Sequence, residues 1–447
     1  MRDFLPDDVR RREYVVGVVR RVYERFGFEP IETPAVENIE TLLGKYGEEG
    51  NQLIFKILKR GVHEGSGEAD LGLRYDLTVP LARVVAEHRA KLPRLFKRCQ
   101  IQPVWRADRP ARGRFREFYQ CDVDTLGSTS PVVEAEQCAA VSEVLAELGF
   151  GDFRIRVNDR RLLTSMLAGA GVPAALHDGA LVALDKLDRL GPDGVGAELE
   201  QRGVPPGARE RLLAVHAEHG GGDSASGVAG ALAALAAAGS RVADVTPAGV
   251  EARESLRVVL ELTRDTAAAP RVAYDPFLAR GLSYYTGAIM EINVPDLAGS
   301  LGGGGRYDNL VGMFSGDTVP ACGFSLGLER ILVVMEERGM FPASLPSAPA
   351  DVMTAVFRPE DLGHALRLAH VLRQSGLRVL VYPDADKMGK QIKYASSRGI
   401  PCVAILGEDE IGRGEVTVKD LASGRQETLA ERGAGAAVKA MLGEGRG

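Results

Sequence analysis

Apolar and polar residues follow two different periods along the first part of the chain. At residues 8–26, valines and aromatic residues recur among arginines at the spacing of an amphipathic helix, which Gly27 would end. Residues 95–106 and 114–124 read as extended segments on either side of a polar turn at 107–113. This pattern predicts a long β-hairpin, whose second strand has one mostly apolar face and one polar face.

The central part of the chain changes character several times. A helix is predicted at residues 131–148, and alanine-rich helical runs with few aromatic residues occupy about 160–265. Strands are predicted at 271–274 and 282–294, before a strand-to-helix unit at 321–338. We interpret the alanine-rich region as a helical insertion into a domain that contains a β-sheet.

A Pro-rich segment at 341–350 has the composition of a linker. Strands and helices alternate after it, which predicts a small α/β domain at 351–447. The expected organisation is therefore a larger domain at 1–340, a linker, and a second domain. A length of 447 residues agrees with more than one hydrophobic core.

Composition excludes several classes of protein. With 45% hydrophobic and 26% charged residues, the chain is typical of soluble globular proteins, and no apolar stretch is long enough for a membrane span. Residues 1–12 do not resemble a signal peptide, and five scattered cysteines without a paired spacing favour a reducing cytoplasm. The net charge of −6 gives no general attraction to nucleic acid, so RNA binding would require local basic patches.

The polar face of the second hairpin strand is the first candidate site. Residues of even number should share that face: Arg114, Arg116, Phe118, Gln120, Asp122 and Asp124. Such a face could stack a base on Phe118, hold phosphates with the arginines and accept an ammonium group at Asp124. An ordinary solvated face with paired charges is the alternative.

Three further segments carry candidate chemistry. Arg280 stands beside Tyr284 and Tyr285, so it could reach an anion while the hydroxyls make directional hydrogen bonds. Core tyrosines with a surface arginine are the alternative. Glycines at 302–305 would let the backbone approach a ligand, unless they form a mobile linker. Arg330 falls in the first turn of a predicted helix, where the helix dipole favours anions.

Taken in order, these segments resemble the histidyl-tRNA synthetase family over the whole chain. An N-terminal motif is matched at 2–6 (RDFLP), and the three class II motifs at 26–34 (FGFEPIETP), 104–122 (VWRADRP through RFREFYQCD) and 323–330 (GFSLGLER). The histidine-specific elements are 73–80 (LRYDLTVP) and 280–285 (RGLSYY). Ser283 departs from the aspartate that is usual at its position.

The resemblance implies a class II catalytic domain, an antiparallel sheet flanked by helices, in which Arg280 and Arg106 are catalytic. It implies that L-histidine is bound by Asp76, Leu77, Thr78, Arg106, Gln120, Asp124, Arg280, Tyr284 and Tyr285. It assigns ATP, as a substrate accompanied by Mg²⁺, to Arg106, Asp108, Arg109, Arg114, Phe118 and Arg330. No metal ligand is expected from the protein itself.

The C-terminal α/β domain resembles the family's anticodon-binding domain, with its most recognisable stretch at 386–394 (DKMGKQIKY). Lys387, Lys390 and Lys393 lie three residues apart on a predicted helix and would form the local basic patch for tRNA(His). A solvated helix face is the alternative. By the same resemblance the protein would be a cytoplasmic homodimer, with Pro34 at the interface.

Two other functions fit parts of the pattern. A non-catalytic paralogue, such as the regulatory subunit of ATP phosphoribosyltransferase, uses this fold to sense histidine but generally lacks the C-terminal domain. A synthetase for proline, threonine or glycine would share that domain. The retained Arg106, Arg280 and Arg330 argue against the first, and the segment at 280–285 argues against the second.

Overall fold

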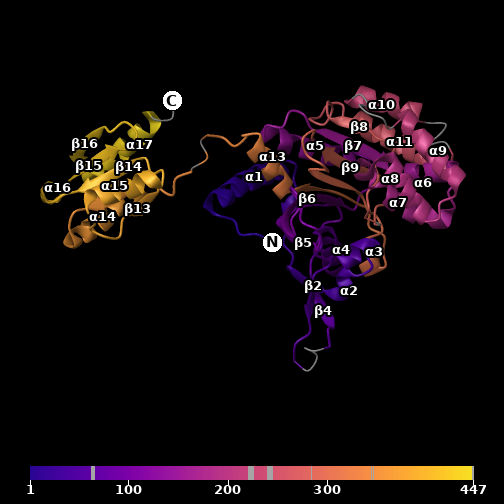
Figure 1. Cartoon of the computed structure of the whole chain (residues 1–447), viewed down its shortest axis with the longest axis horizontal. Coiled ribbons are helices and arrows are strands. Elements are labelled where there is room, and N and C mark those ends of the chain that lie inside the picture. The colour runs from indigo at the N-terminus through magenta and orange to yellow at the C-terminus, as the bar shows by residue number, and fades with distance from the viewer. Residues whose placement is uncertain are drawn as a thin grey trace. The chain divides into compact units, whose positions relative to one another are not determined.

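The computed structural model describes residues 1–61, 66–219, 226–238, 245–282, 284–343, 345 and 347–444. The chain forms two compact units, Met1–Phe341 and Pro342–Gly447 (Figure 1).

An eight-stranded sheet in the order β1-β5-β6-β11-β10-β9-β7-β8 organises the first unit. Its strands are β1 (Glu29–Pro30), β5 (Phe96–Trp105), β6 (Glu117–Leu126), β7 (Arg154–Asp159), β8 (Val272–Tyr274), β9 (Ala288–Asn293), β10 (Gly302–Arg306) and β11 (Ala321–Gly327). The pairs β1–β5 and β7–β8 are parallel, and the pairs between them are antiparallel. The predicted antiparallel sheet is confirmed, with parallel pairs at its two edges.

Three helices pack on the apolar side of this sheet: α1 (Pro6–Arg25), α5 (Val132–Glu147) and α13 (Leu328–Glu337). The predicted helix at 8–26 is α1, which starts at Pro6 because proline at the first position loses no helical hydrogen bond. Val15, Val18, Val19 and Val22 are its buried stripe, at the spacing of one helix face. Gly27 follows the helix with a φ of 74°, a left-handed conformation that favours glycine.

Helices fill the chain between β7 and β8, as the alanine-rich pattern predicted. They are α6 (Arg160–Gly169), α7 (His177–Leu184), α8 (Leu187–Gln201), α9 (Pro206–His219), α10 (Val228–Ala237) and α11 (Pro247–Leu262). Their buried residues belong to the same hydrophobic core as the sheet, and α11 contacts α5, α6 and β7. The break expected at residues 220–224 lies outside the described residues.

A three-stranded sheet, β2-β4-β3, lies beside β5 and carries one wall of the site (Figure 1). It comprises β2 (Val36–Asn38), β3 (Lys56–Leu58) and β4 (Ala69–Leu73), with α2 (Ile39–Leu42), α3 (Gly47–Gln52) and α4 (Thr78–His88) around it. A second core forms where α4 packs near the short helix α12 (Gly312–Ser315). The sequence analysis did not predict these elements.

The second unit is an α/β domain with the strand order β13-β12-β14-β15-β16. Its strands are β12 (Val352–Val356), β13 (Val379–Val381), β14 (Cys402–Leu406), β15 (Glu415–Asp420) and β16 (Gln426–Ala430), and its helices are α14 (Leu362–Gln374), α15 (Met388–Ser397), α16 (Glu408–Arg413) and α17 (Ala434–Glu444). The predicted alternation is present, although β16 and α16 were not predicted. Among the described residues of both units, no helix has the length and apolar character required to cross a bilayer.

Candidate functional site

The two faces of β6 differ as its alternation predicted. Cys121 and Val123 are buried in the core shared with α1 and α5. On the other face, Gln120, Asp122 and Asp124 are only 7%, 1% and 2% exposed. The alternative of a solvated polar face therefore does not apply to these three side chains.

The arginines that precede them are arranged differently from the prediction. The strand begins at Glu117, so Arg114 and Arg116 belong to the turn before it and are exposed. Arg114 closes that turn by pairing with Ala111 through two backbone hydrogen bonds. The predicted ladder of even-numbered residues was thus wrong at its first two positions, because the polar turn extends further than its composition indicated.

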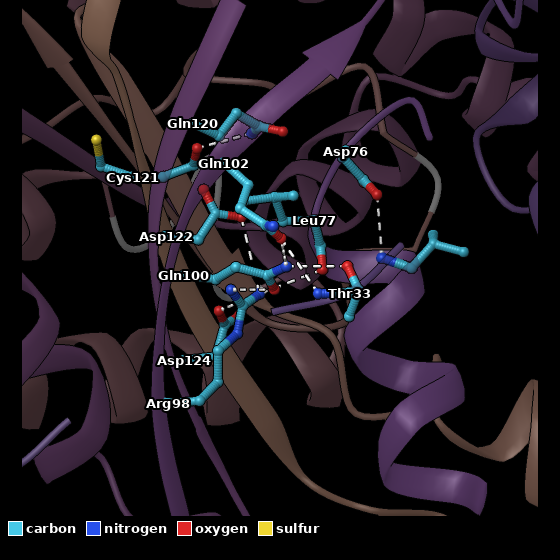
Figure 2. Close-up of polar contacts among 12 residues, drawn as sticks. Thr33, Asp76, Leu77, Arg98, Gln100, Gln102, Gln120, Cys121, Asp122 and Asp124 are labelled. Carbon is cyan, nitrogen blue, oxygen red and sulfur yellow. Dashed lines mark hydrogen bonds and ion pairs between the residues drawn. The ribbon is translucent and has the colours of Figure 1, made fainter. Parts of the chain in front are cut away.

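Arg98 of β5 lies opposite the two carboxylates of β6 and is completely buried (Figure 2). Its Nη2 atom is 2.8 Å from Asp124 Oδ2 and 3.8 Å from Asp122 Oδ2. Its Nη1 donates to Gln100 Oε1 at 3.2 Å, and its Nη2 donates to the backbone oxygen of Leu77 at 3.3 Å. Sequence reasoning missed Arg98, although the antiparallel register that pairs it with Asp124 could have identified it.

Asp76 lies in the loop between β4 and α4 and is 1% exposed. Its Oδ1 accepts hydrogen bonds from Tyr46 Oη and from the backbone N–H of Val79, both at 3.0 Å. Its Oδ2 is 3.4 Å from the Tyr284 hydroxyl, which donates to it. Burial raises the pKa of Asp76 above its usual value, and these hydrogen bonds oppose the rise.

Aromatic side chains join this loop to β6. The Tyr284 ring lies 4.9 Å from Tyr285 and 6.0 Å from Tyr307, measured between ring centroids. The Tyr307 hydroxyl donates to Asp124 Oδ1, while the Tyr284 hydroxyl reaches Asp76 and also bonds Thr78. Segments more than 200 residues apart thus form one cluster. Ser283, which directly precedes Tyr284 in the sequence, lies outside the described residues.

Three buried oxygens on the polar face of β6 accept no hydrogen bond from the described residues. They are Gln120 Oε1, Asp122 Oδ1 and Asp124 Oδ2, although the last is ion-paired with Arg98. Gln120 is held by its other end, since its Nε2 donates to Ser325 Oγ at 2.7 Å. A buried acceptor without a donor is costly, so this face suits a ligand that brings N–H groups.

A group of arginines lies around Arg330, and two of them, Arg106 and Arg280, also lie close to Tyr284. Arg280 Nη1 is 3.1 Å from Glu291 Oε2, and Arg330 donates to the backbone oxygen of Ser300. Burial lowers the pKa of Arg330, and the nearby cations Arg114, Arg106 and Arg280 lower it further. Mutual repulsion among these neighbouring cations is relieved by an anion, which makes this part of the site suited to phosphate.

Arg106 and the loop that follows it form the edge of that cationic group. Arg106 Nε donates to the backbone oxygen of Tyr75 at 3.0 Å, and its guanidinium lies 4.3 Å from the Tyr75 ring centroid and 5.1 Å from that of Phe118. Asp108 accepts a hydrogen bond at its backbone oxygen from Arg116, at 3.1 Å, and Arg109 is exposed.

The glycine cluster forms strand β10, so it is not a mobile linker. A Cβ atom on Gly303 would collide with Arg280 Nη1, and one on Gly323 of β11 would collide with Asp124 Oδ1. The glycine backbone was expected to lie close to a ligand. In the structure it lies close to two side chains of the protein, Arg280 and Asp124. These glycines leave room for the two charged side chains.

In the second unit, Lys387, Lys390 and Lys393 are all exposed at α15. Lys387 occupies the N-cap position of the helix, where its side chain makes no capping hydrogen bond, and Lys390 Nζ is 2.7 Å from Asp386 Oδ2. The predicted basic patch is thus partly neutralised at its centre.

Comparison with known proteins identifies the family. The family model for histidyl-tRNA synthetase matches residues 1–331, and the model for the anticodon binding domain matches 352–441. The chain belongs to the histidyl-tRNA synthetase family. The histidine–tRNA ligase of Porphyromonas gingivalis is 41% identical over 446 residues, or 96% of this chain and 95% of that protein. That of Christiangramia forsetii is 39% identical over 456 residues, covering 98% of both.

Solved structures agree with this assignment. The histidyl-tRNA synthetase of Nostoc sp. PCC 7120 has a TM-score of 0.78 and 32% identity, covering 98% of this chain and 97% of its own. A Bacillus halodurans protein described as an ATP phosphoribosyltransferase regulatory subunit/histidyl-tRNA synthetase has a TM-score of 0.72 at 22% identity, which shows a shared fold. The predicted membership of the histidyl-tRNA synthetase family and the predicted fold are confirmed.

Several residues of the site lie outside the motifs that the resemblance to histidyl-tRNA synthetases rested on. Tyr46 and Tyr307 bind the two carboxylates Asp76 and Asp124, and Glu291 pairs with Arg280. The two residues of each contact are separated by 30, 183 and 11 positions in the sequence, respectively. Only Tyr307 carried a local signal, since it directly follows the glycine cluster and Arg306.

Proposed function

We propose that this protein is a histidine–tRNA ligase, which activates L-histidine with ATP and transfers it to tRNA(His). The observation that carries the proposal is that Tyr284, whose hydroxyl donates to the buried carboxylate of Asp76, also lies within electrostatic reach of Arg106 and Arg280, so that acceptors and cations share one site. Acceptors suit the ammonium and imidazole N–H groups of histidine, whereas the arginines suit its carboxylate and the phosphates of ATP. Family membership supports the same substrates.

The proposed histidine subsite consists of the two carboxylates and their neighbours: Asp76, Leu77, Thr78, Gln120, Asp124, Tyr284 and Tyr285. An ionised carboxylate only accepts hydrogen bonds, so it selects a ligand group that donates them. Asp76 and Asp124 are each oriented by a tyrosine hydroxyl, from Tyr46 or Tyr307. Such fixed acceptors discriminate against amino acids whose side chain has no N–H group. With such a ligand bound, the carboxylate oxygens would be left without a hydrogen-bond donor.

For ATP, we propose contacts from the cationic group and the motif 2 loop: Arg106, Asp108, Arg109, Arg114, Phe118 and Arg330. Phe118 offers a ring face to the adenine, and the arginines offer donors to the phosphates. Because these side chains are already in place, less entropy is lost when ATP is fixed in a single reactive conformation.

In the proposed activation step, a carboxylate oxygen of histidine attacks the α-phosphorus of ATP in line with the leaving diphosphate. An O–P bond forms, the bond to the β-phosphate oxygen breaks, and histidyl-adenylate and diphosphate result. Arg280, held by Glu291, neutralises charge that develops on the α-phosphate, and Arg106 holds both the histidine carboxylate and that phosphate. A terminal hydroxyl of the tRNA then attacks the carbonyl carbon and releases AMP.

Mg²⁺ is proposed to accompany ATP, screening the charge of its phosphates. Among the described residues, no three His, Cys, Asp or Glu side chains lie close enough to form a protein cage for a metal. The ion would accordingly be held mainly by phosphate oxygens and water, as is usual for Mg²⁺ with nucleotides. Within this site Glu291 is a carboxylate of the cationic group that is already paired with Arg280.

We also propose that the protein acts in the cytoplasm as a homodimer and that α15 contributes to tRNA binding.

The proposed dimer would use the surface near the segment resembling motif 1. There, a cavity of about 580 Å³ is lined by residues that include Ile31, Pro34 and Val36. Pro34 and Val36 are exposed in the single chain. Sedimentation velocity should give a mass twice the 47.8 kDa of the chain. A single species of monomer mass at micromolar concentration would reject the dimer.

The decisive experiment is ATP–diphosphate exchange with the purified protein, tested with each of the twenty amino acids. We expect exchange with histidine alone, followed by charging of tRNA(His). Histidine binding without exchange would instead indicate a histidine-sensing paralogue, and exchange with proline, threonine or glycine would indicate another class II synthetase.

A further inference from the structure

Beneath the proposed histidine subsite, Arg98 makes more polar contacts than the subsite residues that surround it. It is buried completely, between β6 on one side and the loop before α4 on the other (Figure 2). Its contacts are with Asp124 and Asp122 on β6, Gln100 on β5 and the backbone oxygen of Leu77. It therefore links the two halves of the subsite, which come from different sheets.

We propose that Arg98 is a positioning residue for histidine, which fixes Asp124 as an ionised acceptor and ties Leu77 to it. This inference rests on the proposed function and adds to it a residue that the family motifs did not include. The role that we assign to Arg98 is exerted through Asp124 and Leu77, its contacts in the two halves of the subsite, and not by contact with the substrate.

The charges around Arg98 explain why it is needed. Two carboxylates, Asp122 and Asp124, are buried opposite a single guanidinium. Arg98 lies 1.0 Å nearer to Asp124 than to Asp122, at 2.8 Å against 3.8 Å. Burial without an adjacent cation favours the protonated form of a carboxyl group, so the closer partner is the one kept ionised. Burial raises the pKa of both carboxyl groups, that of Asp122 to about 7, while the charge of Arg98 lowers the pKa of each.

The orientation of Asp124 is fixed from both ends. Arg98 pairs with its Oδ2 and the Tyr307 hydroxyl donates to its Oδ1, while Gly323 leaves room beside it. Oδ2 still accepts no hydrogen bond from the described residues, so a lone pair remains for an N–H of the ligand. A carboxylate held in this way needs no reorganisation when histidine binds.

The contact with Leu77 extends the effect to the opposite wall. Leu77 lies between Asp76 and Thr78, both assigned to histidine, and its backbone oxygen accepts from Arg98 at 3.3 Å. Lysine at position 98 would retain the charge, but its single ammonium lacks the planar fork that lets Arg98 reach Asp124, Gln100 and Leu77 together.

The test compares Arg98→Lys with Arg306→Lys in ATP–diphosphate exchange, with isothermal titration of histidine in the absence of ATP. Arg306 is a matched control: it is also a buried arginine of the large sheet, with its Nε 2.6 Å from Glu134 Oε1. We expect Arg98→Lys to raise the KM and Kd for histidine about tenfold or more, with the KM for ATP changed less than twofold, since charged hydrogen bonds typically contribute this much. Arg306→Lys should leave the ratio of the two KM values unchanged.

A second variant covers the case in which Arg98→Lys does not fold. Arg98→Gln combined with Asp122→Asn removes one charge of each sign and so preserves the net charge of the cluster. It should show the same selective rise in the histidine KM. Unchanged histidine affinity in a folded variant, or equal losses for histidine and ATP, would overturn the proposal.

Failure of the proposed function gives a different result. Wild-type protein that shows no histidine-dependent exchange would overturn the function, and the assignment of Arg98 with it. Histidine-dependent exchange in the wild type, combined with normal histidine affinity in the Arg98 variants, would overturn the role of Arg98 alone.

Discussion

At the scale of single residues, the proposed chemistry depends most on Arg280. We expect Arg280→Ala to reduce the rate of ATP–diphosphate exchange by about a hundred- to a thousandfold, because one charge-stabilising donor typically contributes that much. The melting temperature should change little, since Arg280 holds Glu291 but is not central to the core packing. Exchange rates and thermal denaturation measured on the same preparation check both expectations.

Arg338→Ala is a suitable control for that experiment. The two arginine side chains are similarly exposed, at 19% and 23%, and both form ion pairs, but Arg338 pairs with Asp152 and Asp296 away from the site. Its exchange rate should stay within about twofold of the wild type. A loss of similar size in both variants would show that general destabilisation, and not charge at the reaction centre, explains the effect.

Gly303 permits a second residue-scale prediction. Gly303→Ala places a methyl group against the Arg280 guanidinium, so we expect exchange to fall at least about tenfold while histidine binding is largely kept. Gly17→Ala is the control, because a Cβ at Gly17 in α1 meets no atom within 4 Å. It should raise the unfolding free energy by about 0.5–1 kcal/mol and leave exchange unchanged. Normal exchange in Gly303→Ala would contradict the proposed use of the glycine.

At the scale of elements, the start of α13 is joined to β6 by a buried carboxyl group. Glu329 is 2% exposed, and its Oε2 accepts the backbone N–H of Tyr119 at 2.8 Å. Burial raises the pKa of Glu329 to about 7, above its value of about 4.5 in an unfolded chain. Between those values the folded protein binds more protons at this group than the unfolded chain does, so its contribution to stability falls as the pH rises.

Glu329→Gln should remove that pH dependence, because glutamine keeps an acceptor for Tyr119 without ionising. We expect the variant to gain stability over the wild type as the pH rises from 5 to 8, by up to about 3 kcal/mol. Chemical denaturation of both proteins across this range measures the difference. Parallel stability curves would contradict the buried, proton-linked role of Glu329.

The longer helices and strands could be predicted from the sequence better than the contacts between side chains of different elements. Alternation along β6 correctly separated Cys121 and Val123 from Asp122 and Asp124, since a strand has a fixed period of two. Arg98 was missed because its importance lies in its register with β6 and its burial, neither of which is written in its local sequence. The short strands β2, β3 and β4 were missed because their stability comes from pairing with one another and from the packing of β2 and β4 against α2.

At the scale of the whole molecule, the two units should divide the two steps of the reaction. We expect the triple variant Lys387→Ala, Lys390→Ala, Lys393→Ala to raise the KM for tRNA in charging about tenfold, without altering ATP–diphosphate exchange. It should also lower the salt dependence of tRNA binding, by about one unit of slope for each phosphate that the lysines no longer neutralise. Because Lys390 is paired with Asp386, its share should be smaller than that of Lys387 or Lys393.

Lys439→Ala serves as the control, since Lys439 is an exposed lysine on α17 of the same unit. Its tRNA KM and salt dependence should match those of the wild type. If the control and the triple variant weaken tRNA binding equally, the effect reflects the total charge of the domain, and α15 is only a solvated helix face.

The order of strands in the large sheet also has a consequence for biosynthesis. On the side away from β5, the neighbour of β6 is β11, which begins at Ala321, roughly 200 residues after β6 ends at Leu126. At about 5–20 residues per second, a ribosome needs about 10–40 s to make the intervening chain. Throughout that interval the edge of β6 that later pairs with β11 has no partner strand. Asp122 and Asp124 also lack the parts of the chain that bury them in the finished protein. The newly made chain is therefore a natural client for chaperones that shield unpaired strands, and a pause in translation before β11 would prolong its exposure to aggregation.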